Sequence, residues 1–129
     1  MIFRSLDFIY IPSHAFETEV TYYTNVLGGE LVFRVHGMGA KVAQIRLGEG
    51  PALLLADHLE GHVPILIYRV DHFEEALNDL EAHGWKRETA FEIPHGPCCS
   101  FVAEGGQRFA IYELARPEAN AHFVGRMDD

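Results

Sequence analysis

The sequence contains no run of roughly 18 apolar residues, the length that a membrane-spanning helix requires. Its first residues, Met1 to Asp7, lack the apolar core and the small-residue cleavage site of a secretory signal peptide. Cysteine is scarce as well, since Cys98 and Cys99 are the only two. Adjacent strand residues point to opposite faces, which disfavours a disulfide between them. We therefore expect reduced thiols, no membrane partner and a cytoplasmic protein.

Basic side chains are also few, because 10 Lys and Arg stand against 19 Asp and Glu, for a net charge of −9. Proteins that bind nucleic acid need a basic surface, so we expect no nucleic-acid partner. Phosphate-binding glycine loops and dinucleotide fingerprints are missing. Ser100 and Cys99 have no assignable base, so the sequence identifies no catalytic residue.

What the chain does contain is a repeat. In each half a strand-like run is followed by a helical stretch and then by glycine, at an offset of roughly 56 residues. The strand-like runs are residues 6–11 and 65–70, and the helical stretches are residues 16–27 and 73–82, ending at Gly28 and Gly84. Further strand candidates follow each helix, at residues 30–35, 41–47 and 52–56 and at residues 86–91, 98–103 and 108–114, separated by turns rich in Gly and Pro. Each half is therefore predicted to be β-α-β-β-β.

Both helices are predicted from apolar residues at helical spacing, which are Phe16, Val20, Tyr23 and Leu27 in the first and Phe73, Ala76, Leu77 and Leu80 in the second. Ser13 is a candidate N-cap of the first helix, and Asp71 with Glu74 has capping-box spacing in the second. At 129 residues we expect a single domain, residues 1–129, made of modules 4–58 and 64–114. The polar tail, residues 115–129, is either loose or docked on a partner.

The two halves resemble the vicinal oxygen chelate superfamily, which contains glyoxalase I, extradiol dioxygenases and bleomycin resistance proteins. The resemblance covers residues 4–114 and rests on four segments in order: LDFIYI at residues 6–11, YYTNVLGG at 22–29, YRVD at 68–71, and PHG at 94–96 followed by AEGGQRFAIYEL at 103–114. It implies an α+β fold in which two βαβββ modules form a curved mixed sheet around a cavity. It also implies a homodimer.

Enzymes of this superfamily hold a divalent metal with one side chain from each of four strands. The matching positions in this chain are Phe8, Ile65 and Ala110, and the repeat offset places the fourth on Leu54. None of these side chains has a lone pair to donate to a metal. We therefore expect no metal at the family position and no cofactor.

Residues two apart on a strand share a face, so the same positions predict the concave surface. It should comprise Leu6, Phe8, Tyr10, Ala52, Leu54, Ala56, Ile65, Ile67, Arg69, Arg108, Ala110 and Tyr112. Phe8, Tyr10, Leu54, Ile65, Ile67, Arg69, Arg108, Ala110 and Tyr112 are the candidate ligand-binding residues. An apolar surface with a few polar groups is typical of a small-molecule site. Gln44 and Arg46 would add polar contacts if their face is the concave one.

Three functions remain open. The first is a metal-independent protein that binds a small hydrophobic or cationic compound, by analogy with the bleomycin resistance proteins and in keeping with the negative charge. The second is a lyase, isomerase or dioxygenase whose metal has moved to His58 and His62, or to His95 with Cys98. The third is a dimerisation or interaction protein in which Phe8, Leu54 and Ile65 fill the cavity as core.

Overall fold

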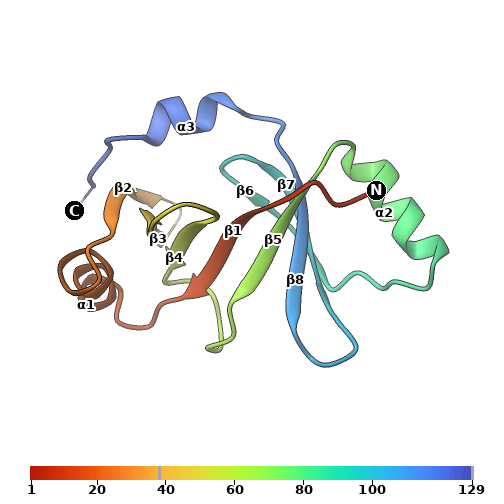
Figure 1. Cartoon of the computed structure of the whole chain (residues 1–129), viewed down its shortest axis with the longest axis horizontal. Helices are drawn as coiled ribbons and strands as arrows, with labels where there is room; N and C mark the ends of the chain where they lie inside the picture. Colours follow the sequence, from red (N-terminus) through yellow and green to blue (C-terminus); the bar gives the residue numbers. More distant parts are fainter. Residues whose placement is uncertain (38, 129) are drawn as a thin grey trace.

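The computed structural model describes residues 1–37 and 39–128. Its strands form an eight-stranded mixed sheet in the order β2-β3-β4-β1-β5-β8-β7-β6 (Figure 1). The strands are β1 Ser5–Pro12, β2 Glu30–Gly37, β3 Ala40–Arg46, β4 Ala52–Ala56, β5 Ile65–Val70, β6 Thr89–Ile93, β7 Gly96–Val102 and β8 Arg108–Glu113. β1 pairs in parallel with β4 and β5 with β8, whereas β1 and β5 are antiparallel and join the halves at the centre. The predicted α+β fold of two β-α-β-β-β series in a curved sheet is confirmed.

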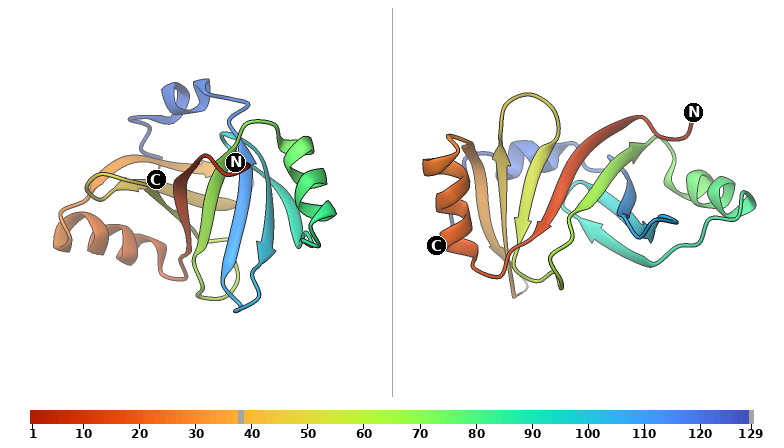
Figure 2. Two further views of the ribbon diagram at one scale, coloured as in Figure 1. Left: turned by 45° about the vertical axis from the view of Figure 1, so that its right-hand side comes forward. Right: turned by 60° about the horizontal axis from the view of Figure 1, so that its bottom comes forward.

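Two helices cover the outer face of the sheet, one on each half (Figure 2). α1 spans Phe16–Thr21 and continues as a π-helical turn, η1, over Tyr22–Val26, while α2 spans Phe73–Ala82. Phe16 and Val20 of α1 pack on Ala43, Ile45 and Leu55. α2 packs likewise on its own half, through Phe73, Ala76 and Leu77 against Val70, Cys99, Phe101 and Ile111. No helix of the described residues has the length and apolar character needed to cross a membrane.

The inner face carries a third, separate core cluster that spans both halves. Its buried members are Phe8, Tyr10, Phe33, Leu54, Ala56, Ile65, Ile67, Ile93, Cys98, Ala110 and Tyr112. Cys98 therefore lies on the inner face and Cys99 on the outer one, as expected for strand neighbours, and both are free thiols. The remaining helix, α3 Glu118–Phe123, lies in the tail, on the inner side of the sheet.

The starts of both outer helices differ from the prediction. Ala15 precedes α1 and His72 precedes α2, and neither helix has a side-chain cap of its own. Ser13 is buried and its hydroxyl donates to Glu19, so the expected Ser13 cap is wrong. The first backbone N–H of α2, that of Phe73, donates instead to Glu113 Oε1 at 2.8 Å. A carboxylate at a helix start also matches the positive end of the macrodipole, which explains why a cap from β8 replaces a local one.

Other parts of the chain differ from the prediction as well. The first helix stops being α-helical after Thr21, because the chain widens into the π-turn that ends at Gly28, which is in the left-handed region (φ 76°). β6 begins at Thr89, since Glu88 is held by its own N–H and side chain to Ser100. The tail is docked, because the backbone N–H groups of Gly125 and Asp128 donate to carbonyls of β2.

A β-bulge in β1 overturns one predicted position. Leu6 pairs with Tyr68 and Phe8 pairs with Ile67, so Asp7 has no opposite residue on β5. A bulge places two successive residues on the same side of a strand. Phe8 is in the inner cluster, whereas Tyr68 packs on Phe3 and Phe109 outside. Leu6 therefore faces outward, and Asp7 takes the inner position that we predicted for Leu6.

Tyr10 is one of the most enclosed titratable groups of the inner cluster. Its side chain is 4% exposed. Burial, with a smaller contribution from Cys98, raises the pKa of Tyr10 to about 12. The folded state therefore favours the protonated Tyr10 hydroxyl more strongly than the unfolded state does.

Gly96→Ala is expected to destabilise the fold severely. A Cβ at Gly96 would lie 1.9 Å from the backbone oxygen of Glu113, at the point where β7 starts beside the end of β8. Relieving such an overlap requires a backbone shift, for which we expect a loss of roughly 3 kcal/mol in the free energy of unfolding by urea denaturation. Gly37→Ala is the control, since a Cβ there meets no atom within 4 Å. Equal stability of both variants would refute the tight packing at Gly96.

The stability should also fall on the alkaline side. The unfolded tyrosine loses its proton near pH 10 and the folded Tyr10 only near pH 12. The contribution is therefore complete below pH 10 and is lost as the pH rises towards 12, by on the order of 2 kcal/mol. Denaturant titrations of the wild type and Tyr10→Phe between pH 8 and 12 measure this loss of unfolding free energy. An identical alkaline loss in both proteins would show that Tyr10 is not its source.

Candidate functional site

The structure brings the predicted site residues together on the inner face. Phe8, Tyr10, Leu54, Ile65, Ile67, Ala110 and Tyr112 belong to the inner cluster, and none is more than 6% exposed. Arg69 and Arg108 flank it, because Arg69 pairs with Tyr112 and Arg108 with Ile65 across the β5–β8 ladder. Whether these residues bind a ligand stays a prediction.

One row of side chains crosses the inner face from one wall to the other. Residues paired on neighbouring strands point to the same side, about 4.8 Å apart. From β3 to β8 the row is Gln44, Leu54, Tyr10, Ile65 and Arg108, and Phe33 of β2 pairs with Gln44 just beyond it. In the sheet order, β3 with Gln44 and β8 with Arg108 lie on opposite sides of β1, which carries Tyr10. Gln44 therefore lies on the concave side, as we had considered.

Both ends of this row carry a buried polar atom that is not satisfied. Gln44 Oε1 and Arg108 Nε are shielded from solvent and have no hydrogen-bond partner. Another nitrogen of Arg108, Nη2, donates to Glu88 at 2.9 Å, and Glu88 also accepts from the Ser100 hydroxyl. These contacts lower the pKa of Glu88, chiefly through the hydrogen bond from Arg108. Arg108 is thus fixed in place while its Nε remains a free donor.

A second polar group lies at the other end of the inner face. The Tyr112 hydroxyl donates to Asp7 Oδ2 and the Ser5 hydroxyl to Asp7 Oδ1, each at 2.5 Å. Burial raises the pKa of Tyr112, and the hydrogen bond to Asp7 raises it further, so the phenol stays protonated. Arg69 lies beside this pair and forms no ion pair with any residue that the structure describes. The imidazole of His95 packs on Phe8 with ring centroids 4.6 Å apart.

The residues at the family metal positions do not fit a metal. Phe8, Leu54, Ile65 and Ala110 all face the inner cluster, where a metal would meet carbon atoms only. Among residues 1–37 and 39–128 there is also no group of three or more His, Cys, Asp or Glu side chains that could hold a metal. No chemical step through a metal follows from this site.

The histidines weighed as a relocated metal site contact aromatic rings and belong to no group of three or more metal-ligating side chains among the described residues. His58 meets Tyr10 edge-on at 6.3 Å, and His62 lies 4.9 Å from His14, whose Nε2 donates to the Gly61 carbonyl. His95 and Cys98 are both buried. Burial raises the pKa of the Cys98 thiol, which disfavours the thiolate that a metal needs.

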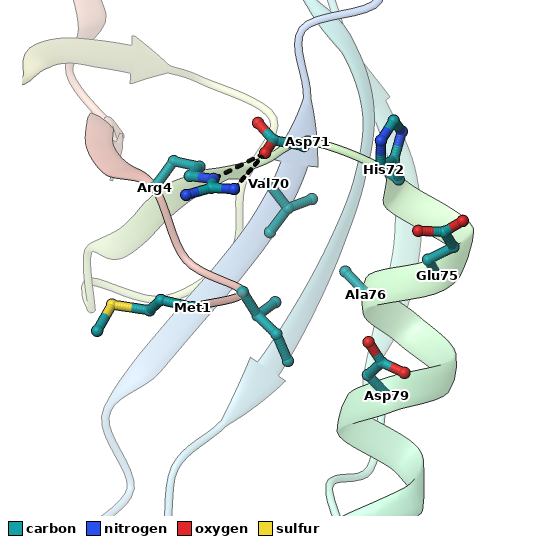
Figure 3. Close-up of a pocket in the computed structure, with 9 residues that line it drawn as sticks. Met1, Arg4, Val70, Asp71, His72, Glu75, Ala76 and Asp79 are labelled. Carbon is teal, nitrogen blue, oxygen red and sulfur yellow. Dashed lines mark hydrogen bonds and ion pairs between the residues drawn. The ribbon is translucent and has the colours of Figure 1, made fainter.

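Surface cavities outside the inner face include two in the second half of the fold. One of ≈310 Å³ separates the N-terminal segment from α2, where Arg4 Nε donates to Asp71 at 2.7 Å and Glu75 and Asp79 add negative charge (Figure 3). The other, of ≈370 Å³, is lined by Phe3, Tyr68, Phe101 and Phe109 on the outer face. Solvent-exposed acids and an outer aromatic patch do not identify a ligand, so we assign none to either cavity.

Sequence reasoning missed Asp7 and Phe33. Asp7 was placed on the outer face because alternation through β1 hides a bulge, and no residue type at positions 6–8 signals one. Phe33 lies in β2, which carries its own irregularity between Leu31 and Phe33 and has no family motif. A comparison of the strand registers is needed to find either.

No family model matches the chain, and no curated protein sequence matches it either. Several solved structures, in contrast, are similar to this chain. Methylmalonyl-CoA epimerase from Mycobacterium tuberculosis has a TM-score of 0.75 at 19% identity, over 92% of this chain and 93% of that one. A hypothetical protein from Bacillus halodurans C-125 gives 0.73 at 16% identity, over 86% and 94%. A Streptomyces coelicolor methylmalonyl-CoA epimerase variant in complex with 2-nitronate-propionyl-CoA gives 0.72 at 14% identity, over 88% and 99%.

At these identities the likeness shows the fold and leaves the activity open. The epimerases are members of the vicinal oxygen chelate superfamily, and their fold extends over nearly the whole of this chain. The motifs, the two β-α-β-β-β halves and the solved structures agree. The chain therefore has the fold of the vicinal oxygen chelate superfamily.

Proposed function

We propose that this protein binds a small organic molecule on the inner face of its sheet without a metal. The observation that carries the proposal is the pair of unsatisfied buried atoms, Gln44 Oε1 and Arg108 Nε, at the two ends of the row through Tyr10. A buried polar atom without a partner costs about 1–3 kcal/mol. A ligand that bonds to both atoms recovers that free energy, which supports binding at this place.

The chemistry of the row describes the ligand. Gln44 Oε1 is an acceptor and Arg108 Nε a donor, so the ligand needs a donor on one edge and an acceptor on the other. Between them the surface is made of Leu54, Tyr10 and Ile65, with Phe33 beyond Gln44, and it favours a flat apolar body. This pattern of a few polar groups in an apolar surface is that of small-molecule sites.

The similarity to epimerases does not supply a metal site in this chain. Their names connect them with methylmalonyl-CoA, and one is complexed with a nitronate analogue of an acyl-CoA. In this chain the four superfamily metal positions are Phe, Leu, Ile and Ala, which leaves no protein donor there. The enzyme alternative therefore requires chemistry by other residues, and we rank it second.

The interaction-protein alternative draws on the burial of the inner face. The four metal positions are at most 6% exposed, which is also what a filled core looks like. A filled core, however, gives no account of the unsatisfied Gln44 and Arg108 atoms. We therefore retain ligand binding as the main function, and the homodimer and the cytoplasmic location stay predictions.

A small panel of compounds tests the proposal. 4-Quinolone is a flat bicycle with an N–H on one edge and a carbonyl oxygen on the other, and its N-methyl derivative lacks the donor. We expect calorimetric binding of 4-quinolone in the presence of EDTA, with N-methyl-4-quinolone weaker by roughly tenfold, which corresponds to one lost hydrogen bond. Bleomycin, a cationic antibiotic, belongs in the same panel because of the −9 charge. Flat heats for all three compounds, or binding only after metal is added, would contradict the proposal.

Replacing Gln44 should separate stability from binding. Gln44→Met keeps the length of the side chain and removes the unsatisfied oxygen, so we expect about 1 kcal/mol of added stability in urea denaturation. The same variant should bind 4-quinolone roughly tenfold more weakly, since its N–H loses an acceptor. Arg46→Met is the control, because Arg46 lies two residues along β3, is exposed and pairs with Glu30. A loss of stability in Gln44→Met would mean that its oxygen is already satisfied in the free protein.

A further inference from the structure

The tail of the chain crosses the open side of the inner face. Residues 116–128, the C-terminal strap, leave the end of β8, form α3, and finish beside β2 at the far edge of the sheet (Figures 1 and 2). The strap therefore connects the two walls that carry Arg108 and Gln44.

The strap is attached firmly where it begins. The backbone N–H of Arg116 donates to the His95 carbonyl, and its guanidinium donates to the carbonyls of Pro94 and Ile93. The same guanidinium pairs with Glu92 at 2.9 Å. These contacts tie the first strap residue to the β6–β7 turn, so this end acts as a hinge point.

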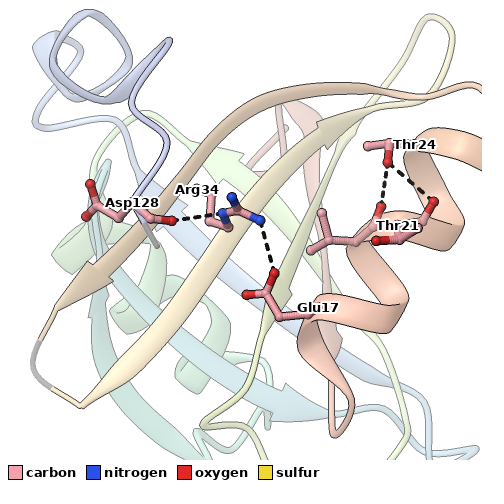
Figure 4. Close-up of polar contacts among 6 residues, drawn as sticks. Glu17, Thr21, Thr24, Arg34 and Asp128 are labelled. Atoms are coloured by element: carbon pink, nitrogen blue, oxygen red, sulfur yellow. Dashed lines mark hydrogen bonds and ion pairs between the residues drawn. The ribbon is translucent and has the colours of Figure 1, made fainter.

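The far end is held mainly by backbone hydrogen bonds at the exposed edge of the sheet. The Gly125 N–H donates to the Val32 carbonyl. The Arg34 N–H donates to the Arg126 carbonyl, and the Asp128 N–H donates to the Arg34 carbonyl. The Arg34 side chain bridges the strap and α1, since Nε donates to the Asp128 carbonyl and Nη1 to Glu17 (Figure 4). Arg126 and Asp128 form an exposed ion pair, and such pairs contribute little to stability.

Phe123 is the main apolar contact between the two anchors. Its ring packs on Phe33 with centroids 5.6 Å apart, and Phe33 pairs with Gln44 at one end of the row. The guanidinium of Arg126 lies 5.8 Å from the centre of the same ring. The neighbouring side chains contribute little, since Val124 is 56% and Met127 46% exposed. One aromatic ring of the chain itself thus lies on the face proposed for the ligand.

The strap has few means of staying closed by itself. α3 has six residues, and helices shorter than about 12 residues are marginal without tertiary packing. Segments with few buried apolar contacts and solvent-exposed hydrogen bonds open locally at low free energy. The rest of the inner face is formed by paired strands, which separate only when the sheet unfolds.

We propose that Phe123 is a built-in occupant of an aromatic subsite on Phe33, and that a ligand enters by displacing it and lifting the far end of the strap. This inference rests on the proposed function and adds two things to it. It assigns an aromatic ring to the ligand, because that ring takes the place of Phe123. It also makes the strap a competitor, so that the apparent affinity is lowered by the fraction of molecules in which the strap is closed.

Hydrogen exchange of the free protein tests the strap without any ligand. We expect the amides of Gly125 and Asp128 to exchange through a local opening that denaturant barely affects, whereas the amide of Ile111 in the sheet exchanges through global unfolding. If the strap amides exchange only on global unfolding, the strap is a fixed part of the core and the inference fails, while the proposed function survives.

Two variants test the competition. Phe123→Ala removes the occupant and should bind 4-quinolone roughly tenfold more tightly than the wild type, with the Gln44 side-chain amide resonance shifting on binding. Val124→Ala, at the next and exposed position, should match the wild type. Saturation with 4-quinolone should reduce the protection of the Gly125 amide in the wild type.

The outcomes separate the two proposals. Binding by the wild type with unchanged affinity in Phe123→Ala, or with added protection at Gly125, overturns the displacement of Phe123 and leaves ligand binding intact. Binding by Phe123→Ala alone supports both. An unmoved Gln44 resonance in the wild type and in both variants removes the proposed function, and the displacement with it.

Discussion

The burial of an apolar inner face is the constraint on which this structure depends. A curved sheet with helices on its outer side leaves its concave side to be covered by something else, and here that side is lined by Phe8, Leu54, Ile65 and Ala110. Exposed to water, such a surface would be an interaction site or an aggregation hazard. The chain covers it with its own tail, and the strong attachment of Arg116 at one wall makes that cover possible.

The same constraint bears on the four positions at which the superfamily resemblance implies metal ligands. Where a metal site needs nitrogen and oxygen donors facing inward, this chain places carbon at all four positions. The polar groups that remain are displaced to the rims: Gln44 and Arg108 at one level, and Asp7 with Tyr112 at the other. A surface of this kind can hold and orient a molecule, and it offers no Lewis acid of its own. This arrangement supports the proposal that the inner face binds a small molecule.

Much of the fold follows from the sequence, and the reasons are visible in particular elements. Strand β5 and helix α2 have the predicted bounds, 65–70 and 73–82, because each has an uninterrupted pattern bounded by turn residues. The bulge at Asp7 could not be predicted, since it exists only in the register between β1 and β5. The Glu113 cap of α2 joins residues 40 apart, and the strap is held by backbone groups that carry no residue signature. The predicted site residues lie on one face, as expected. Gln44 of β3 lies on the same face, but the alternation of residues in β3 could not show which of its two faces is concave.

The central claim is that a small molecule lies between Gln44 and Arg108, over Tyr10, with no metal present. Intermolecular nuclear Overhauser effects between 4-quinolone and the protein, recorded in EDTA, test this most directly. The account predicts contacts from the quinolone ring to Phe33 and Tyr10 and to the side-chain amide of Gln44, all of which face the same side of the sheet. Contacts confined to the outer aromatic residues Phe3, Tyr68, Phe101 and Phe109 would contradict it, because they would place binding on the opposite face.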